Sequence, residues 1–370
     1  MANEKWYELN DVKNVVSPSL LVYPDRIEKN IQLMISVAGG SHLLRPHIKT
    51  HKTAEIIKMQ IDHGISKFKC ATIAEAELLA QCGAQDILMA MQPVGANIQR
   101  FFGLVRKYPD SKFSTLLDSF KILDEIAVMA SDEKKIISLW MDINVGMNRT
   151  GISPNAEAIK LYESIEHHPF LEAEGLHAYD GHIHNSDVSE RKKVCDTAFE
   201  KVLELKDALQ AKGIAIDVIV AGGSPSFPIH SERANVETSP GTTLLWDARY
   251  SEQFPDMEFL NAAVLFIRIV SKPSSNIVCF DLGHKMIASE MDFPRLRILG
   301  LEESVQIAQS EEHLVVETPL ADDFEVGDGF YAIPMHICPT VAKYENLLTV
   351  KNGKILGSWK VVARNQKITI

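Results

Sequence analysis

Short apolar runs alternate with longer stretches of helical period along roughly the first 250 residues. The run "HLLRPHI" (42–48) precedes the amphipathic stretch "TAEIIKMQIDHG", and "KFKCA" precedes "IAEAELLAQCG". The alternation continues through "DILMAM", "KFSTLLD", "IISLWMDIN", "AEGLHAY" and "AIDVIVAGG", and "ETSPGTTLLW" supplies the last apolar run. Apolar runs separated by helices predict parallel strands with right-handed crossovers. About eight such units favour an α/β fold with a closed (β/α)8 TIM-like barrel over an open doubly wound sheet.

The pattern changes near residue 255. From there on, short runs such as "NAAVLFIRIVSK", "NIVCFDLG" and "GDGFYAIP" are joined by turn residues, which predicts an all-β domain. We therefore expect a barrel domain over residues 20–254 and a C-terminal β domain over residues 255–370. Residues 1–19 are expected to pack on the β domain.

Composition narrows the class of protein. The 370 residues are 46% hydrophobic and 24% charged, which is typical of a globular protein with enough apolar material for a large barrel and a companion domain. A net charge of −11 argues against a nucleic-acid partner, and no apolar run suggests a membrane span. The start "MANEKWYELNDVKN" lacks the apolar core of a signal peptide. Five cysteines without CxxC spacing favour a reducing, cytoplasmic setting.

Candidate chemistry is expected where barrel strands end, because active sites of such barrels lie at the carboxyl ends of the strands. The segment "RPHIKTHK" (45–52) falls at such an end and is rich in cations. Lys49 is a candidate for a lysine partly withdrawn from water among other cations. Both effects lower the pKa of an amine and make it a better nucleophile or Schiff-base former. The alternative is a set of solvated cations on a surface loop.

Two glycine-containing loops are candidates for binding an anion. In "VAGGSPS" (220–226), two glycines and a serine after a strand let backbone N–H groups converge on a phosphate. In "SPGTT" (239–243), the N–H of Gly241 and the hydroxyl of Thr242 could serve the same anion. Plain glycine turns are the alternative.

Further polar groups follow two other predicted strands. In "INVGMNRTGI", Arg149 could pair with an anionic oxygen or form a salt bridge at a helix start. In "HAYDGHIH" (177–184), Tyr179 and His182 could stack on a planar cofactor or hydrogen-bond to it, although a buried histidine is often a satisfied core residue.

A candidate metal pair lies in the β domain. In "IPMHICPT" (333–340), His336 and Cys338 are two residues apart, so both side chains of an extended strand would point to one face. An imidazole and a thiolate suit zinc, and two protein ligands leave positions for substrate and water. The alternative is a pair without a metal.

Together these segments resemble the group of D-threonine aldolases and eukaryotic-type D-serine dehydratases, pyridoxal-phosphate enzymes that share the alanine racemase fold (fold type III). The resemblance runs nearly end to end and includes "SPSLLVYPDRIEKNI", "LRPHIKTHKTAEI", "GLHAYDGHIH", "AGGSPSF" and "GDGFYAIPMHICPTV". It implies a barrel that carries the cofactor, a β domain that faces it, a homodimer and a small D-amino acid as substrate.

The resemblance also implies residue roles. Lys49 matches the lysine that binds the cofactor as a Schiff base, with Lys52 as a contender. The residues implied to hold pyridoxal 5'-phosphate are Lys49, Arg149, Tyr179, Gly222, Gly223, Ser224, Thr238, Ser239, Gly241 and Thr242. Ser239 stands where alanine racemases carry an arginine that faces the pyridine nitrogen, which disfavours racemisation.

By the same resemblance, His336 and Cys338 match the divalent-metal pair of the group. The cysteine favours a zinc-dependent dehydratase, since D-threonine aldolases more often carry an aspartate there, whereas Met335 departs from the polar residue expected. We expect a metal-assisted lyase for a β-hydroxy D-amino acid, most similar to a D-serine ammonia-lyase. The alternatives are a D-threonine aldolase with His182 as base, an amino-acid racemase and a non-catalytic cofactor-binding protein.

Overall fold

The computed structural model describes residues 5–370, and the chain divides into two compact units. The barrel unit consists of Met34–Lys49, Ile57–Gly241 and Asn365–Ile370. The sheet unit consists of the described part of Met1–Leu33, Thr50–Ile56 and Thr242–Arg364. Because the two units interleave along the chain, the expected boundary near residue 254 stays a prediction. Residues 1–4 of the expected N-terminal segment lie outside the described residues.

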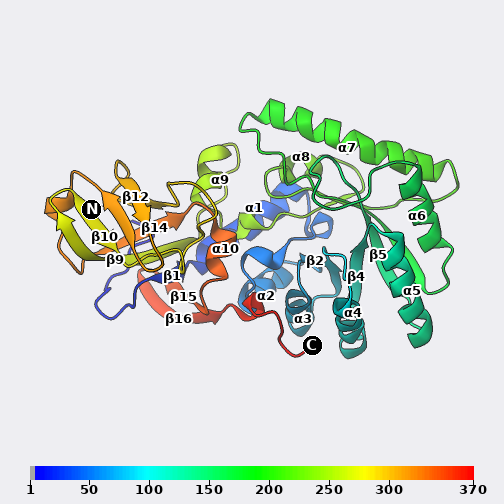
Figure 1. Ribbon diagram of the computed structural model, residues 1–370, viewed down its shortest axis with the longest axis horizontal. Helices are drawn as coiled ribbons and strands as arrows, with labels where there is room; N and C mark the ends of the chain where they lie inside the picture. The colour runs from blue at the N-terminus through cyan, green and yellow to red at the C-terminus, as the bar shows by residue number, and fades with distance from the viewer. Residues whose placement is uncertain (1–4) are drawn as a thin grey trace. The chain divides into compact units, whose positions relative to one another are not determined.

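The barrel unit is built on seven parallel strands that pair in chain order. They are β2 (Lys67–Cys70), β3 (Asp86–Met89), β4 (Lys112–Leu117), β5 (Ile137–Asp142), β6 (Leu171–Ala178), β7 (Ile219–Ala221) and β8 (Val236–Thr238). The crossover helices are α3 (Ile73–Gln81), α4 (Ala96–Lys107), α5 (Phe120–Glu133), α6 (Ala156–Glu166), α7 (Val188–Gln210) and α8 (Phe227–Ser231). Figure 1 shows α3, α4 and α5 side by side next to strands β2–β5. Parallel pairing directs all the carboxyl ends of the strands to one end of the unit.

Three crossover helices begin at side chains that cap their free N–H groups. Thr72 accepts a hydrogen bond from the N–H of Glu75 at the start of α3. Asn155 and Asp187 cap α6 and α7 in the same way. Such caps stabilise a helix start by about 1 kcal/mol, and they fix where each loop at a strand end gives way to helix.

The prediction that residues 42–48 form the first regular strand is wrong. Ser41–Leu43 form a 3-10 turn (η1), and Pro46 has no N–H to donate to a ladder. Isolated parallel bridges nevertheless join Leu44 to Thr238 of β8 and His47 to Lys69 of β2. An irregular segment therefore links the two ends of the seven-stranded sheet, where an eighth strand was expected.

Arg45 fixes this irregular segment in place. Its N–H donates to the carbonyl of Thr238 at 2.8 Å. Its buried guanidinium donates to Glu237 at 2.7 Å and to Asp86 at 2.6 Å. One of the cations of "RPHIKTHK" is thus a structural group inside the barrel unit.

The predicted last strand, "ETSPGTTLLW", is shorter than expected. Only Val236–Thr238 pair with β7, and Thr242–Leu244 form a 3-10 turn (η3). Pro240 and Gly241 interrupt the strand, because proline donates no ladder hydrogen bond and glycine weakens a strand interior.

The sheet unit contains a nine-stranded sheet with the order β12-β13-β10-β9-β1-β15-β16, and β14 pairs with β9 and β11. The strands are β1 (Ser19–Val22), β9 (Ala263–Ser274), β10 (Ile277–Phe280), β11 (Leu296–Ile298), β12 (Val305–Gln309), β13 (Leu314–Glu317), β14 (Gly329–Pro334), β15 (Asn346–Lys351) and β16 (Lys354–Lys360). All pairs are antiparallel except β1 with β15. Short helices α9 (Ala248–Gln253) and α10 (Ile337–Val341) also belong to this unit. The predicted fold class, a parallel α/β barrel with a separate sheet domain, is confirmed.

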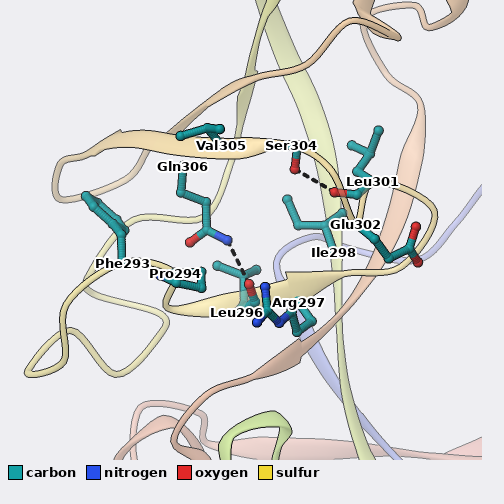
Figure 2. A pocket seen from close by; sticks show the side chains of 10 residues that line it. All are labelled: Phe293, Pro294, Leu296, Arg297, Ile298, Leu301, Glu302, Ser304, Val305 and Gln306. Carbon is teal, nitrogen blue, oxygen red and sulfur yellow. Dashed lines mark hydrogen bonds between the residues drawn. The ribbon is translucent and has the colours of Figure 1, made fainter. Parts of the chain in front are cut away.

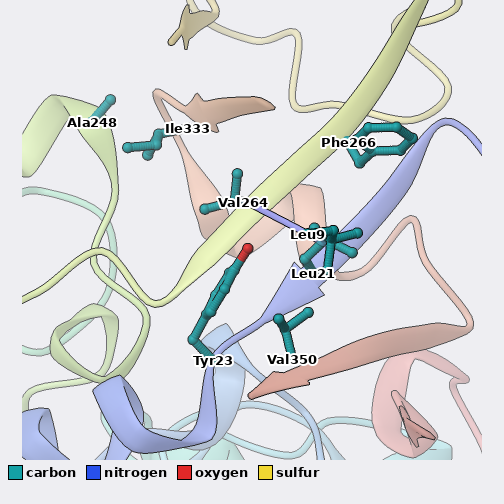
Figure 3. Packing of buried hydrophobic residues seen from close by; sticks show 8 residues of the cluster. All are labelled: Leu9, Leu21, Tyr23, Ala248, Val264, Phe266, Ile333 and Val350. Carbon is teal, nitrogen blue, oxygen red and sulfur yellow. The ribbon is translucent and has the colours of Figure 1, made fainter. Parts of the chain in front are cut away.

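Apolar side chains from several strands of this sheet form one core (Figure 3). Val264 and Phe266 lie two residues apart on β9 and point to the same face, where Leu21 of β1 packs against them. The N-terminal segment joins this core through Leu9, whose N–H donates to the hydroxyl of Tyr331 at 2.9 Å.

A cavity of about 220 Å³ opens between β11 and β12 (Figure 2). Its wall is mostly apolar and includes Leu296, Ile298 and Val305, and Gln306 donates to the carbonyl of Leu296 at 2.7 Å. None of the site residues predicted from the sequence lines it. Among the described residues, no helix combines the length and apolarity that a membrane span requires.

Candidate active site

The two candidate lysines belong to different units. Lys49 lies in the 3-10 turn η2 (Ile48–Thr50), its side chain is exposed, and its N–H donates to Nδ1 of His47 at 3.2 Å. Lys52 lies in the sheet unit, where its carbonyl accepts a hydrogen bond from Ala363. Of the two, Lys49 therefore shares the barrel unit with the predicted cofactor residues Arg149 and Tyr179.

Tyr179 directly follows β6 and is the centre of a cluster of cations and glycines. Cζ of Arg149 lies 4.7 Å from the ring centroid, and Nζ of Lys69 lies 5.6 Å from it. A Cβ atom added at Gly223 or Gly181 would lie 3.0 Å or 2.3 Å from ring atoms of Tyr179. Only glycine lets the backbone approach the ring this closely, so a side chain at either position would displace the ring of Tyr179.

Within the barrel unit, the first predicted anion loop contacts the start of the second, which continues into the sheet unit at Thr242. The N–H of Gly241 donates to the hydroxyl of Ser224 at 3.1 Å. Gly222 directly follows β7 with a φ of 80°, a conformation that favours glycine. Its N–H donates to Ala178, and the N–H of Gly223 donates to Ser226. An anion bound by these N–H groups would therefore have to replace Ala178 and Ser226 as their acceptors.

Two polar side-chain atoms of this region are buried and have no hydrogen-bond partner. They are the hydroxyl of Ser239, which follows β8, and Nδ1 of His182. An unsatisfied buried polar atom costs about 1–3 kcal/mol, so each of these atoms is a position where a ligand or a water molecule would bind. The neighbouring Thr238 is satisfied, because its hydroxyl donates to the carbonyl of Leu43 at 3.4 Å. The ring nitrogen of pyridoxal phosphate would supply the hydrogen-bond partner that the Ser239 hydroxyl lacks.

Lys69 is a second amine that sequence reasoning missed. It is 2% exposed, and its Nζ lies 3.5 Å from Nε2 of His177. Nδ1 of His177 donates to Asp142 at 2.7 Å, which leaves Nε2 as the acceptor for Lys69. Burial lowers the pKa of Lys69 to about 7, and the charge of Lys49 contributes. The environment that the sequence suggested for Lys49 is thus found at Lys69.

In the sequence, the alternation of lysines with apolar residues in "KFKC" (67–70) is the feature that could have identified Lys69. On a strand, Lys67 and Lys69 share one face while Phe68 and Cys70 share the other. Lys67 pairs with Glu237, so the same face carries both lysines toward polar partners of the barrel unit.

Asp180, Cys195 and His230 form a buried cluster that the sequence did not reveal, because they come from three separate segments. Nε2 of His230 lies 2.8 Å from Asp180 and 3.3 Å from the sulfur of Cys195. A carboxylate, a thiolate and an imidazole suit a divalent metal. Burial raises the pKa of the Cys195 thiol to about 12, however, and this disfavours the thiolate that a metal would bind. Asp180 also accepts from Ser226 at 2.7 Å, which ties the cluster to the Gly223 loop.

His336 and Cys338 lie in the sheet unit, but not on a strand as predicted. β14 ends at Pro334, His336 is the N-cap of α10, and Cys338 lies in its first turn. Pro339 is tolerated there because the first turn of a helix has free N–H groups in any case. The turn still brings the two side chains into contact. Burial alone would lower the pKa of His336, but its hydrogen bonds to Cys338 and Glu290 raise that pKa to about 9.

Polar side chains surround both members of this pair. Glu290 contacts Nδ1 of His336 at 2.5 Å. The sulfur of Cys338 lies 3.0 Å from the hydroxyl of Thr50 and 3.6 Å from that of Thr242. Thr242, expected in the phosphate site, thus contacts the candidate metal pair. In the sequence, Thr50 directly follows Lys49 and Thr242 directly follows Gly241.

Solved structures define the class of fold. The structure is similar to that of D-threonine aldolase from Filomicrobium marinum, with a TM-score of 0.87 and 25% identity, covering 94% of this chain and 96% of that one. The fold is alanine racemase-like, with a barrel of parallel strands and a separate, mostly sheet-containing domain.

Sequence comparison identifies the family. Residues 22–248, more than half of the chain, match the alanine racemase N-terminal domain, and the chain belongs to that family. Residues 262–350 match the "Putative serine dehydratase domain". The chain is 28% identical to D-threonine aldolase of an Arthrobacter species, over 95% of this chain and 93% of that protein. It is 22% identical to D-serine dehydratase of Dictyostelium discoideum, over 95% of this chain and 98% of that protein.

The buried amine of Lys69 makes stability depend on pH. Its pKa is lower in the folded chain than in the unfolded chain, so between about pH 7 and pH 10 the unfolded chain binds more protons. The free energy of unfolding should therefore rise with pH, by at most about 1.4 kcal/mol per pH unit from this group. Lys69→Met should flatten that rise in urea titrations at several pH values. Lys58→Met, which removes an exposed lysine, should follow the wild type, and an unchanged slope in the Lys69 variant would contradict the assignment.

Proposed function

We propose that this protein is a pyridoxal-phosphate-dependent, metal-assisted lyase that acts on a β-hydroxy D-amino acid. One observation carries the proposal: candidate cofactor groups come directly after successive parallel strands. Tyr179 follows β6, Gly222 follows β7 and Ser239 follows β8. Strand ends are where barrels of this kind place their chemistry. The named relatives that span the chain, an aldolase and a dehydratase, support the class of reaction.

In this proposal, side chains of the chain bind each part of the cofactor. Lys49 binds its aldehyde carbon, Tyr179 lies against its ring, Arg149 pairs with its ring oxygen and Ser239 hydrogen-bonds its ring nitrogen. The groups that bind its phosphate are Gly222, Gly223, Ser224, Gly241 and Thr242, with Thr238 beside them. Support comes from the unpartnered Ser239 hydroxyl and from the close approach of Gly223 to Tyr179.

The metal is proposed to bind His336 and Cys338, and an imidazole with a thiolate favours zinc. When bound, the cofactor supplies an electron sink for charge at Cα, and the metal supplies a Lewis acid for the β-hydroxyl. Nζ of Lys49, once the substrate amine has replaced it at the aldehyde carbon, is proposed as the base that takes the proton from Cα. Loss of that proton and of the β-hydroxyl, followed by hydrolysis, converts the substrate into a keto acid and ammonia.

Elimination is the reaction that we favour, because Cys338 offers the sulfur ligand expected of the dehydratases in this group. The second candidate is a retro-aldol cleavage to glycine and an aldehyde. It is favoured by the similarity to D-threonine aldolase and by the unpartnered Nδ1 of His182, which could accept the proton of the β-hydroxyl. Racemisation is disfavoured because Ser239 is neutral. A cytoplasmic homodimer remains our prediction for the working protein.

Product analysis tests the reaction. With cofactor and zinc saturating, D-serine should give pyruvate and D-threo-3-hydroxyaspartate should give the corresponding keto acid and ammonia. Glycine and acetaldehyde from D-threonine would instead establish the aldolase. If none of the three substrates yields either set of products, the proposed lyase is wrong.

Covalent attachment of the cofactor tests Lys49. After borohydride reduction, mass spectrometry should find the cofactor on the peptide that contains Lys49, and Lys49→Ala should lose the visible absorbance of the bound cofactor. Lys52→Ala is the matched control, because it removes the neighbouring amine and should retain both signals. Cofactor on Lys52 or Lys69 would overturn the assignment.

Metal content tests which cysteine binds the metal. Cys338→Ser should lose stoichiometric zinc while it retains pyridoxal phosphate, since thiolate sulfur is the softer ligand that zinc prefers. Cys195→Ser should keep its zinc, because that thiol belongs to the separate cluster with Asp180 and His230. Elemental analysis of both purified variants decides the point, and the reverse pattern would move the metal to the Asp180 cluster.

A further inference from the structure

The carboxylate of Glu290 faces the candidate metal histidine from a neighbouring segment. Its Oε1 accepts a short hydrogen bond from Nδ1 of His336, with the two atoms 2.5 Å apart. Because Nδ1 is engaged in this way, Nε2 is the ring nitrogen that remains to bind a metal. A carboxylate that accepts the second N–H of a metal-binding histidine fixes both the tautomer and the orientation of the ring.

The segment that carries Glu290 is hydrogen-bonded to the turn that carries His336. The N–H of Ala288, two residues earlier, donates to the hydroxyl of Thr340 at 3.1 Å. The same hydroxyl donates to the carbonyl of His336 at 2.8 Å. This chain of two hydrogen bonds connects the segment that carries Glu290 to the residue that Glu290 contacts.

The backbone between the two candidate metal-binding residues is fixed as well. Asp247 is 2% exposed, and one of its oxygens caps α9 by accepting from Tyr250. Its other oxygen accepts from the N–H of Ile337 at 3.2 Å. Ile337 lies between His336 and Cys338, so this hydrogen bond restrains the backbone that links the pair.

We propose that Glu290 is a positioning residue of the metal site, which holds the His336 ring so that Nε2 faces the ion. This inference rests on the proposed function, since it takes His336 and Cys338 as the metal-binding pair. Glu290 itself remains bound to the histidine and does not bind the metal. Its carboxylate makes the imidazole a stronger donor and restricts its rotation, and both effects strengthen metal binding.

Zinc affinity is the direct test, measured by competition with a chromophoric chelator on the cofactor-loaded protein. Outer-shell partners of this kind contribute roughly 10–100-fold to metal affinity. Glu290→Ala should lie in that range, and Glu290→Gln, which keeps an acceptor without the charge, should lose less. Asp292→Asn is the matched control, because it removes an exposed carboxylate from the same segment, and its affinity should stay near that of the wild type.

Cobalt substitution separates an orienting role from direct coordination. At saturating Co²⁺, Glu290→Ala should keep the sulfur-to-cobalt charge-transfer band and the ligand-field spectrum of the wild type, since the ion keeps the same ligands. A changed ligand-field spectrum would make Glu290 a metal-binding residue, and an unchanged zinc affinity in both Glu290 variants would remove its role altogether. Either result would overturn the inference.

The same measurements distinguish this inference from the proposed function. If Cys338→Ser binds zinc as tightly as the wild type, the proposed metal pair is wrong, whatever the Glu290 variants do. If Cys338→Ser loses zinc while the Glu290 variants retain full affinity, the pair stands and only the role of Glu290 fails.

Discussion

The parallel pairing of β2–β8 is the constraint on which the rest of the barrel unit depends. Since all seven strands run in one direction, their carboxyl ends share one end of the sheet, and residues far apart in the sequence follow those ends. Arg45 supports this arrangement by tying the irregular segment before Lys49 to Glu237 and Asp86. A charge buried in this way is stable only while its partners remain in place, so the entry to the Lys49 turn is fixed by the barrel itself.

The chain brings its two groups of candidate site residues together in two different ways. In the barrel unit, a small number of glycines lets the backbone approach the ring of Tyr179, and the polar groups around it come from separate strand ends. In the sheet unit, His336 and Cys338 come from a single turn at the start of α10, whose backbone is fixed by Asp247. In the proposed function, the first group would bind the planar cofactor and the second a single ion.

The fold class was predictable because hydrophobic periodicity reports which faces of each element are buried. The departures have local causes. Pro46 prevents residues 42–48 from forming a regular strand, and Pro240 and Gly241 end the last one early. Pro334 ends β14 before His336, so the two-residue spacing brings the imidazole and the sulfur together through a helix N-cap and its first turn. Periodicity carries little information about such short interruptions.

The sequence by itself determined the alternation of strands and helices, the change to a sheet near residue 255 and the local motifs around Lys49, Tyr179, Gly222 and His336, because these depend on neighbouring residues. Only the tertiary structure decided the groups that depend on distant partners. Lys69 is withdrawn from water beside His177, Asp180 meets Cys195 and His230, and Glu290 meets His336. Burial and long-range pairing are properties of the folded chain, so no stretch of sequence contains them.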